Sequence, residues 1–241
     1  MLLHMPGLAI IIPCYNEEDR LDKAAIGTLL ESIDVVLFFV NDGSSDHTLD
    51  LLNELAGKYP DKISVLSFSV NEGKAKAIAK GFQHVIAMSS FRYIGYMDAD
   101  FSTPVPEFIK LYTTLLERNA SFIFASRIKK LNSGINRKPT RHIIGRVIST
   151  IIDLRFKLGV YDTQCGAKIF SSNTLTAAFD KPFFCNWLFD VEIFIRLKEK
   201  NLLKEGIEFP ITGWKDVHGS KLSLINFPKI VREFITLTRK Y

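Results

Sequence analysis

Short apolar runs that end in polar turns recur along the first half of the chain, and helix-forming stretches separate them. Runs of about four to eight β-branched and aromatic residues are typical of buried strands, and strands that alternate with helices form parallel sheets. Parallel strands end at one edge of a sheet, where such proteins bind ligands. The pattern therefore predicts an α/β protein with one functional edge. The predicted strands are Leu8–Pro13, Val35–Val40, Ile63–Phe68, Tyr93–Met97 and Ser121–Ala125.

Composition narrows the class of protein. The 241 residues are 47% hydrophobic, which is ordinary for a globular protein, and the length suits one large α/β domain or two small ones. The three cysteines are scattered and include no Cys-x-x-Cys pair, so we expect neither a disulfide framework nor a zinc site, and we expect a reduced compartment. No stretch has the ~18–20 apolar residues that cross a membrane, and the start of the chain lacks the basic region of a signal peptide. These features predict a cytoplasmic protein with no membrane span.

Positive charge is concentrated between Arg127 and Lys157, where nine Lys and Arg residues accompany a single acid. Such a segment implies an anionic partner: a phosphate, lipid headgroups or nucleic acid. Aromatic residues for base stacking are not interleaved here, so nucleic acid is disfavoured. The helical patterns of His142–Leu158 and Leu224–Tyr241 suit either the core or an anionic membrane surface, and we expect the first to face mainly the core. Leu131–Pro139 is predicted to be a loop.

The turns after the predicted strands suit a nucleotide and its phosphates. Tyr15 can stack on a base, and Asn16 and Glu17 can bind its polar edges. Asp42 can accept a hydrogen bond from a base or a ribose. Gly73 and Lys74 would bring free backbone N–H groups and a cation together, which fits a phosphate or a carboxylate. The G-x-G-x-x-G spacing of dinucleotide-binding proteins and the G-x-x-x-x-G-K spacing of P-loops are absent from these turns. The turns therefore disfavour a Rossmann oxidoreductase and a P-loop protein.

Asp98 and Asp100 directly follow the predicted strand Tyr93–Met97. Two carboxylates one residue apart can converge on one hard cation, and such a cation assists the departure of a diphosphate. A turn that merely caps the next helix explains the pair equally well. The other turns at the same edge therefore decide between the two interpretations.

Four motifs, in their order along the chain, resemble those of the inverting nucleotide-sugar glycosyltransferases of family 2, which have the GT-A fold. The motifs are Pro13-x-Tyr-Asn-Glu17, Asn41-Asp-Gly-Ser44, Gly73-Lys74 and Asp98-Ala-Asp100. Three later segments resemble the dolichyl- and polyprenyl-phosphate β-glucosyltransferases and, less closely, the dolichyl-phosphate mannose synthases. These segments are Asp162–Phe170, Phe189–Glu192, and Trp214 with Gly219–Leu222. The chain departs from the pattern at Ser102, where the mannose synthases have Gln, and at Ala167, where Phe is usual.

The resemblance implies one GT-A catalytic domain over residues 1–241, with a Rossmann-like, mostly parallel central sheet flanked by helices, a basic helical and loop segment, and a C-terminal amphipathic helix. Residues of about 1–126 would bind the nucleotide sugar, and residues of about 127–241 would bind the acceptor.

The resemblance also implies roles for individual residues. The nucleotide-sugar-binding residues would be Pro13, Tyr15, Glu17, Asp42, Gly73, Lys74 and Asp98. Asp98 and Asp100 would hold Mg²⁺ or Mn²⁺. The catalytic residues would be Asp100 and Asp190, of which Asp190 has the position that resembles the family's catalytic-base aspartate. The acceptor-phosphate-binding residues would be Arg127, Arg141, Arg146, Gln164 and Lys221.

The implied reaction moves a hexose, with glucose from UDP-glucose as the best candidate, to a polyprenyl or dolichyl phosphate. The product is a β-linked lipid-phosphate sugar, and a nucleoside diphosphate leaves. We therefore expect a metal-dependent hexosyltransferase that lies peripherally on the cytoplasmic face of a membrane, against anionic lipids, with a separate membrane protein as a further candidate partner. Three alternatives stay open: a family-2 enzyme with a glycan or lipid-linked-sugar hydroxyl as acceptor, a nucleotidyltransferase that releases pyrophosphate, and a non-catalytic nucleotide-sugar-binding scaffold at the membrane.

Overall fold

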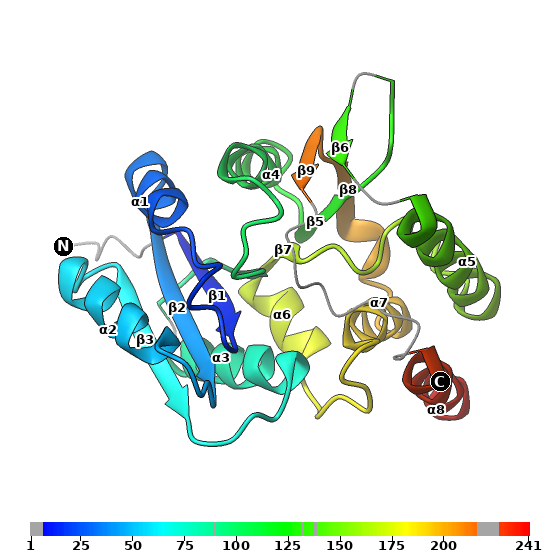
Figure 1. Ribbon diagram of the computed structural model, residues 1–241. Coiled ribbons are helices and arrows are strands. Elements are labelled where there is room, and N and C mark those ends of the chain that lie inside the picture. The colour runs from blue at the N-terminus through cyan, green and yellow to red at the C-terminus, as the bar shows by residue number, and fades with distance from the viewer. Residues whose placement is uncertain (1–6, 89, 132, 137–138, 216–226) are drawn as a thin grey trace.

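A computed structural model describes residues 7–88, 90–131, 133–136, 139–215 and 227–241. A seven-stranded sheet runs through the middle of the molecule, with helices on both faces (Figure 1). The strand order is β3-β2-β1-β4-β7-β5-β8. The elements of the first half are β1 (Leu8–Cys14), α1 (Lys23–Ser32), β2 (Val35–Asp42), α2 (Thr48–Lys58), β3 (Ile63–Phe68), α3 (Lys74–Met88), β4 (Tyr93–Met97), α4 (Val105–Glu117) and β5 (Phe122–Ser126).

The second half of the chain completes the sheet and adds a two-stranded sheet of β6 and β9. Its elements are β6 (Gly134–Asn136), α5 (Pro139–Phe156), β7 (Ala167–Ser171), α6 (Ser172–Ala178), α7 (Phe189–Glu199), the 3₁₀ turn η1 (Leu203–Glu205), β8 (Gly206–Pro210), β9 (Gly213–Lys215) and α8 (Phe227–Lys240). In Figure 1, α5 and α8 lie at the right of the molecule, far from α1 and α2 at the left.

The inner strands of the main sheet are buried on both faces, because their side chains alternate between two hydrophobic cores, whereas the edge strands β3 and β8 are mostly half-buried. In β1, Ile10 packs in the core that includes Phe108 of α4. The next residue, Ile11, packs in the core that includes Phe82 of α3 and Phe194 of α7. This double burial explains why the strands read as continuous apolar runs.

The expected mostly parallel sheet is confirmed, with one exception. β1 pairs in parallel with β2 and β4, so the turns after these three strands meet at one edge of the sheet. β7 lies between β4 and β5 and is antiparallel to both. In the pairing of β4 with β7, Tyr96 stands directly opposite Lys168.

Two expectations for the basic segment are corrected. The predicted loop Leu131–Pro139 contains a strand, β6, because β9 offers it a parallel partner. The expected core-facing helix is α5, but its apolar residues divide between two sides. Ile152 and Phe156 are buried, whereas four others are exposed, which shows that only part of the apolar surface reaches the core. The exposed residues are Ile143, Val147, Ile151 and Leu154.

Candidate active site

The turns after β1 and β2 are held together by hydrogen bonds. The backbone N–H of Asn16 donates to Ser44 Oγ (3.1 Å), and Asn16 Oδ1 accepts from the N–H of Ser45 (2.9 Å). Asn16 has a φ of 53°, a left-handed conformation that Asn tolerates better than most residues. The sequence did not reveal this connecting role. Its effect is to place Tyr15 and Glu17, the expected nucleotide-binding residues, beside the turn after β2. Pro13 stands near the end of β1 and is half-buried.

Asp42 is buried at the end of β2, where it holds the loop before α3. Its Oδ1 accepts from the N–H of Glu72 (3.0 Å), and its Oδ2 accepts from the N–H of Gly73 (2.8 Å). The N–H of Gly73 is therefore not free for a phosphate, which corrects that part of the sequence interpretation. Gly43 allows the close approach, since a Cβ there would lie 2.7 Å from the backbone nitrogen of Asn71.

Asp98 lies directly after β4 and contacts two elements. Lys74 Nζ, at the start of α3, donates to Asp98 Oδ1 at 2.5 Å. The N–H of Asp98 donates to the carbonyl of Gly166 at 3.0 Å, and a Cβ on Gly166 would lie only 1.9 Å from Asp98 Oδ2. Gly166 therefore leaves the space that the Asp98 carboxylate occupies. The ion pair also confirms that Lys74 and Asp98 meet at the same edge of the sheet.

Lys74 is a common neighbour of three carboxylates. Burial alone would lower the pKa of its ammonium, but the negative charges of Asp98, Asp190 and Asp100 raise that pKa above its ordinary value. These acids come from the β4 turn and from α7, which lies much later in the chain. The structure therefore brings the expected donor-side carboxylates and Asp190 into one site.

Asp100 is held within its own turn by Ser102, whose N–H (3.0 Å) and hydroxyl (2.5 Å) both donate to Oδ1. Burial and the nearby charge of Asp98 raise the pKa of the Asp100 carboxyl above its ordinary value. A divalent cation would relieve this repulsion, and carboxylate oxygens are the ligands that Mg²⁺ and Mn²⁺ prefer. Among the described residues, no group of three or more His, Cys, Asp or Glu side chains is arranged to hold a metal. Asp98 and Asp100 could supply two carboxylate ligands to a cation, and its remaining ligands would have to come from substrate and water.

Asp190 lies in the first turn of α7 and is buried. Its Oδ1 accepts hydrogen bonds from Lys168 Nζ (2.7 Å) and from the hydroxyl of Tyr96. The start of α7 is fixed from α8, because Glu233 Oε2 accepts from the N–H groups of Trp187 and Leu188, both at 2.8 Å. The sequence reasoning missed Lys168, Tyr96 and Glu233, since each acts across a long separation in the chain.

The basic residues expected at an acceptor phosphate are partly engaged within the protein. Arg127 donates from Nε (2.7 Å) and Nη2 (2.8 Å) to Asp162, and its guanidinium lies over the ring of Trp214. Arg146 donates to the carbonyl of Tyr161 and stacks over its ring. Gln164 lies half-buried in the loop before β7. The side chain of Arg141 and the whole of Lys221 lie outside the described residues.

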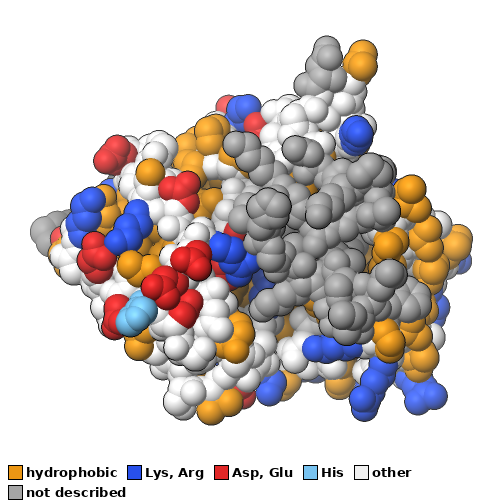
Figure 2. Space-filling model, viewed as in Figure 1, with side chains coloured by type: hydrophobic (Ala, Val, Ile, Leu, Met, Phe, Trp, Pro, Cys, Tyr) orange, Lys and Arg blue, Asp and Glu red, His pale blue; other side chains and the backbone are white. Residues whose placement is uncertain are grey.

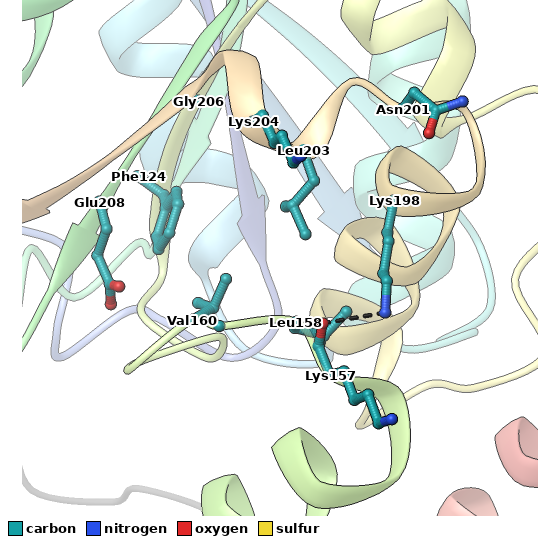
Figure 3. A pocket seen from close by; sticks show the side chains of 11 residues that line it. Phe124, Lys157, Leu158, Val160, Lys198, Asn201, Leu203, Lys204, Gly206 and Glu208 are labelled. Carbon is teal, nitrogen blue, oxygen red and sulfur yellow. Dashed lines mark hydrogen bonds between the residues drawn. The ribbon is translucent and has the colours of Figure 1, made fainter.

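A cavity of about 500 Å³ opens elsewhere, between β5, β8, η1 and the end of α7 (Figure 3). Its lining includes Phe124, Lys198 and Glu208 but none of the residues expected at the site. Lys198 points to the backbone at the end of α5, where its Nζ donates to the carbonyl of Lys157 (3.0 Å). The expected site residues therefore lie at the sheet edge and outside the lining of this cavity.

The acidic turns and their order along the sheet match a known family. The sequence model of Glycosyl transferase family 2 matches residues 9–176, which include β1 to β7 and all the expected nucleotide-sugar-binding residues. The chain belongs to glycosyltransferase family 2. Asp190 and α7 lie beyond the matched stretch of this family-2 glycosyltransferase.

Curated relatives of this family-2 glycosyltransferase extend the similarity over nearly the whole chain. A dolichyl-phosphate beta-glucosyltransferase of Trichomonas vaginalis is 28% identical over 95% of this chain and 72% of its own length. The Saccharomyces cerevisiae protein of that name is 28% identical, over 97% of this chain and 75% of its own. The Homo sapiens protein is 29% identical, over 89% and 69% respectively.

Solved structures confirm the fold. Glucosyl-3-phosphoglycerate synthase from Mycobacterium tuberculosis superposes with a TM-score of 0.70 at 19% identity, covering 97% of this family-2 chain and 79% of that protein. Mannosyltransferase PcManGT from Pyrobaculum calidifontis, solved with GDP-Man and Mn²⁺, gives a TM-score of 0.62 at 14% identity, covering 91% and 59%. The GT-A fold that the sequence predicted is thereby confirmed.

Proposed function

We propose that the protein transfers glucose from UDP-glucose to dolichyl or another polyprenyl phosphate, with inversion to a β-linked product. The name shared by relatives from three distant organisms supports the acceptor and the sugar. The observation that carries the proposal is the position of Lys74 among Asp98, Asp100 and Asp190. Around Lys74, the acidic pair Asp98 and Asp100, which would bind a cation beside a nucleoside diphosphate, lies near Asp190, which suits the acceptor.

We assign different steps of the reaction to different residues of the site. Asp98 and Asp100 would hold Mg²⁺ or Mn²⁺, which would neutralise charge on the departing diphosphate. Lys74 adds a positive charge beside them. A lipid phosphate is already ionised near neutral pH, so we propose that Asp190 orients the acceptor rather than deprotonates it. Tyr15, Glu17 and the loop held by Asp42 would enclose the nucleotide, within the donor-binding half of about residues 1–126.

The acceptor phosphate would meet the basic residues after β5. Two nitrogens of Arg127 already donate hydrogen bonds to Asp162. We therefore propose that Arg127 shapes this loop and contributes positive charge, and that it does not form a bidentate hydrogen bond with the acceptor phosphate. Arg141, Arg146, Gln164 and Lys221 stay candidates for direct contact.

The reaction is tested with purified protein, radiolabelled UDP-glucose and dolichyl phosphate. Expected products are an acid-labile glucosylated lipid and UDP. Transfer only to a sugar hydroxyl, together with a much larger loss in Asp190→Asn, would support the alternative acceptor class. Release of pyrophosphate would identify a nucleotidyltransferase, and binding of UDP-glucose without turnover would identify a scaffold.

Lys74→Met is expected to lower turnover about tenfold, because the variant removes the charge beside Asp98. The matched control is Lys76→Met, two residues along α3, whose ammonium pairs with Glu72 at the surface. Both variants are compared by kcat and KM for UDP-glucose. Equal activity in the two would show that Lys74 has no role in transfer.

Chelation of divalent cations is expected to remove at least about nine-tenths of the activity, because the diphosphate would leave against the unrelieved charges of Asp98 and Asp100. The measurement is glucose transfer in EDTA, followed by titration with Mg²⁺ and Mn²⁺. Full turnover in EDTA would rule out the metal-binding role of the two acids.

A peripheral position on the cytoplasmic face of a membrane is also part of the proposal. No helix among the described residues has the length and apolarity that crossing a bilayer requires. Hydrophobic side chains gather along the right of the molecule, where Figure 1 places α5 (Figure 2). The exposed apolar residues of α5 and the basic charge of the same segment suit an anionic lipid surface.

Val147→Glu combined with Leu154→Glu is expected to lower binding to phosphatidylserine-containing vesicles about tenfold or more, since burying such side chains in lipid contributes about 1.5–3 kcal/mol each. Leu154 is 74% exposed. The control is Val70→Glu, a change at a valine of similar exposure (66%) after β3. Vesicle flotation measures the bound fraction. If wild-type protein does not float, recruitment would require a separate membrane protein.

A further inference from the structure

Lys168 is a buried cation in the middle of the sheet. It lies in β7, and its residue surface is 0% exposed. Its Nζ donates to Asp190 Oδ1 and to the carbonyl of Cys165, both at 2.7 Å. It also lies 5.3 Å from the ring centre of Tyr96. A buried ammonium is strongly unfavourable unless an opposite charge and hydrogen-bond acceptors surround it, so the Asp190 carboxylate is its essential partner.

The two acceptors of Lys168 belong to the two halves of the site. Cys165 precedes Gly166, whose lack of a side chain makes room for Asp98. Asp190 opens α7 and is the carboxylate proposed to act on the acceptor. The Lys168 side chain therefore links the loop before β7, which shapes the donor side, to α7, which carries Asp190.

Both hydrogen bonds to Asp190 fall on the same oxygen. Lys168 and Tyr96, which face each other across β4 and β7, both donate to Oδ1. Within the part of the chain that the structure describes, Oδ2 receives no hydrogen bond. This arrangement fixes the side-chain rotamer through one oxygen and leaves the other for a substrate group.

We propose that Lys168, assisted by Tyr96, is a positioning residue that holds the Asp190 carboxylate in the orientation that leaves Oδ2 for the acceptor. The inference rests on the proposed function, because it gives Asp190 a role at the acceptor. Lys168 has no hydrogen bond to the turns after β1 and β2 among the described residues. Its contact on the donor side is with the backbone carbonyl of Cys165, whereas Asp98 itself is held by Lys74. Loss of Lys168 should therefore slow the transfer step while leaving donor binding nearly intact.

The test is a double-mutant cycle in the full chain. Lys168→Met is expected to lower kcat about 100-fold, the loss typical of a misplaced catalytic group, while KM for UDP-glucose changes less than about threefold. Tyr96→Phe should give a smaller loss, because Lys168 still holds Oδ1. In an Asp190→Asn background, Lys168→Met should lower kcat by less than about twofold more, since the group through which it acts is gone.

A purely structural role predicts a different pattern. The two losses would then multiply in the double variant, and that result would overturn the proposal, as would a kcat for Lys168→Met within about twofold of wild type. If Lys168→Met alone does not fold, Tyr96→Phe carries the cycle instead, because Tyr96 donates to the same oxygen of Asp190 and its loss removes no charge. Its effect on kcat should then vanish in the Asp190→Asn background, and an unchanged effect there would overturn the proposal. Lys110→Met, which removes an exposed ammonium paired with the buried Glu107, is the control for a lysine remote from Asp190.

A different result would contradict the proposed function. Absence of glucose transfer to polyprenyl phosphate by the wild-type protein would contradict that function. The same variants, assayed with whichever acceptor the wild type does use, would still show whether Lys168 acts through Asp190.

Discussion

Gly166→Ala is expected to lower turnover about 1000-fold while the protein still folds. The added Cβ would lie 1.9 Å from Asp98 Oδ2, so the carboxylate must swing away from its position beside Lys74. The three nearest atoms, Oδ2, Cγ and Oδ1, all belong to the Asp98 side chain, so the carboxylate can rotate away without a clash between the new Cβ and the backbone. Loss of a preorganised charged group at a reacting centre commonly costs 10²–10³-fold, and here the proposed metal-binding position is lost as well. The measurements are kcat and the melting temperature.

The control for Gly166→Ala is Gly57→Ala near the end of α2, where a Cβ would meet nothing within 4 Å. This control should keep full activity and gain about 0.5–1 kcal/mol in the free energy of unfolding, because alanine favours the helix over glycine. Near-normal turnover of Gly166→Ala would mean that the position of Asp98 does not matter for transfer.

Arg196→Met is expected to lower the free energy of unfolding by about 3–5 kcal/mol, because it leaves the carboxylate of Glu192 buried without its cation. Arg196 Nη2 donates to Glu192 Oε1 at 2.6 Å, and both side chains are almost wholly buried. The guanidinium also donates to the carbonyls of Ala178, Lys181 and Pro182, which fixes the chain between α6 and α7. Denaturant unfolding followed by circular dichroism measures the effect.

Lys200→Met provides the matched comparison one turn later. Lys200 pairs with Asp180 at the same 2.6 Å, but these side chains are 37% and 35% exposed. Water and salt screen such a pair, so a loss of less than about 1 kcal/mol is expected. Similar losses in the two variants would contradict the importance assigned to burial of the Glu192–Arg196 pair.

Local sequence patterns predicted most of the sheet and the acidic half of the site. The strand Tyr93–Met97 is buried on both faces, so its apolar run stands out, and Asp98 follows it at the predicted edge. Lys74 was recognisable because it directly follows a glycine at the start of a helix. These features depend on neighbours in the chain, which is the information that periodicity carries.

The features that were missed depend on distant partners. The antiparallel direction of β7 is set by its pairing with β4 and β5, and nothing within Ala167–Ser171 specifies it. Arg127 was expected to bind a phosphate, and its pairing with Asp162, 35 residues later, was not predicted. Nothing in the sequence distinguished Lys168 from the other polar residues of its motif, because only the fold brings it within hydrogen-bonding distance of Asp190.

The cap on α7 has a consequence for synthesis of the chain. Glu233, which accepts the N–H groups at the start of that helix, follows Leu188 by 45 residues. During translation the sheet and the donor-side turns can form first, whereas the helix that carries Asp190 lacks its cap until α8 has left the ribosome. Chains that stop before α8 should therefore retain nucleotide binding but not transfer. The order of synthesis thus delays assembly of the complete site until almost the whole described chain is present.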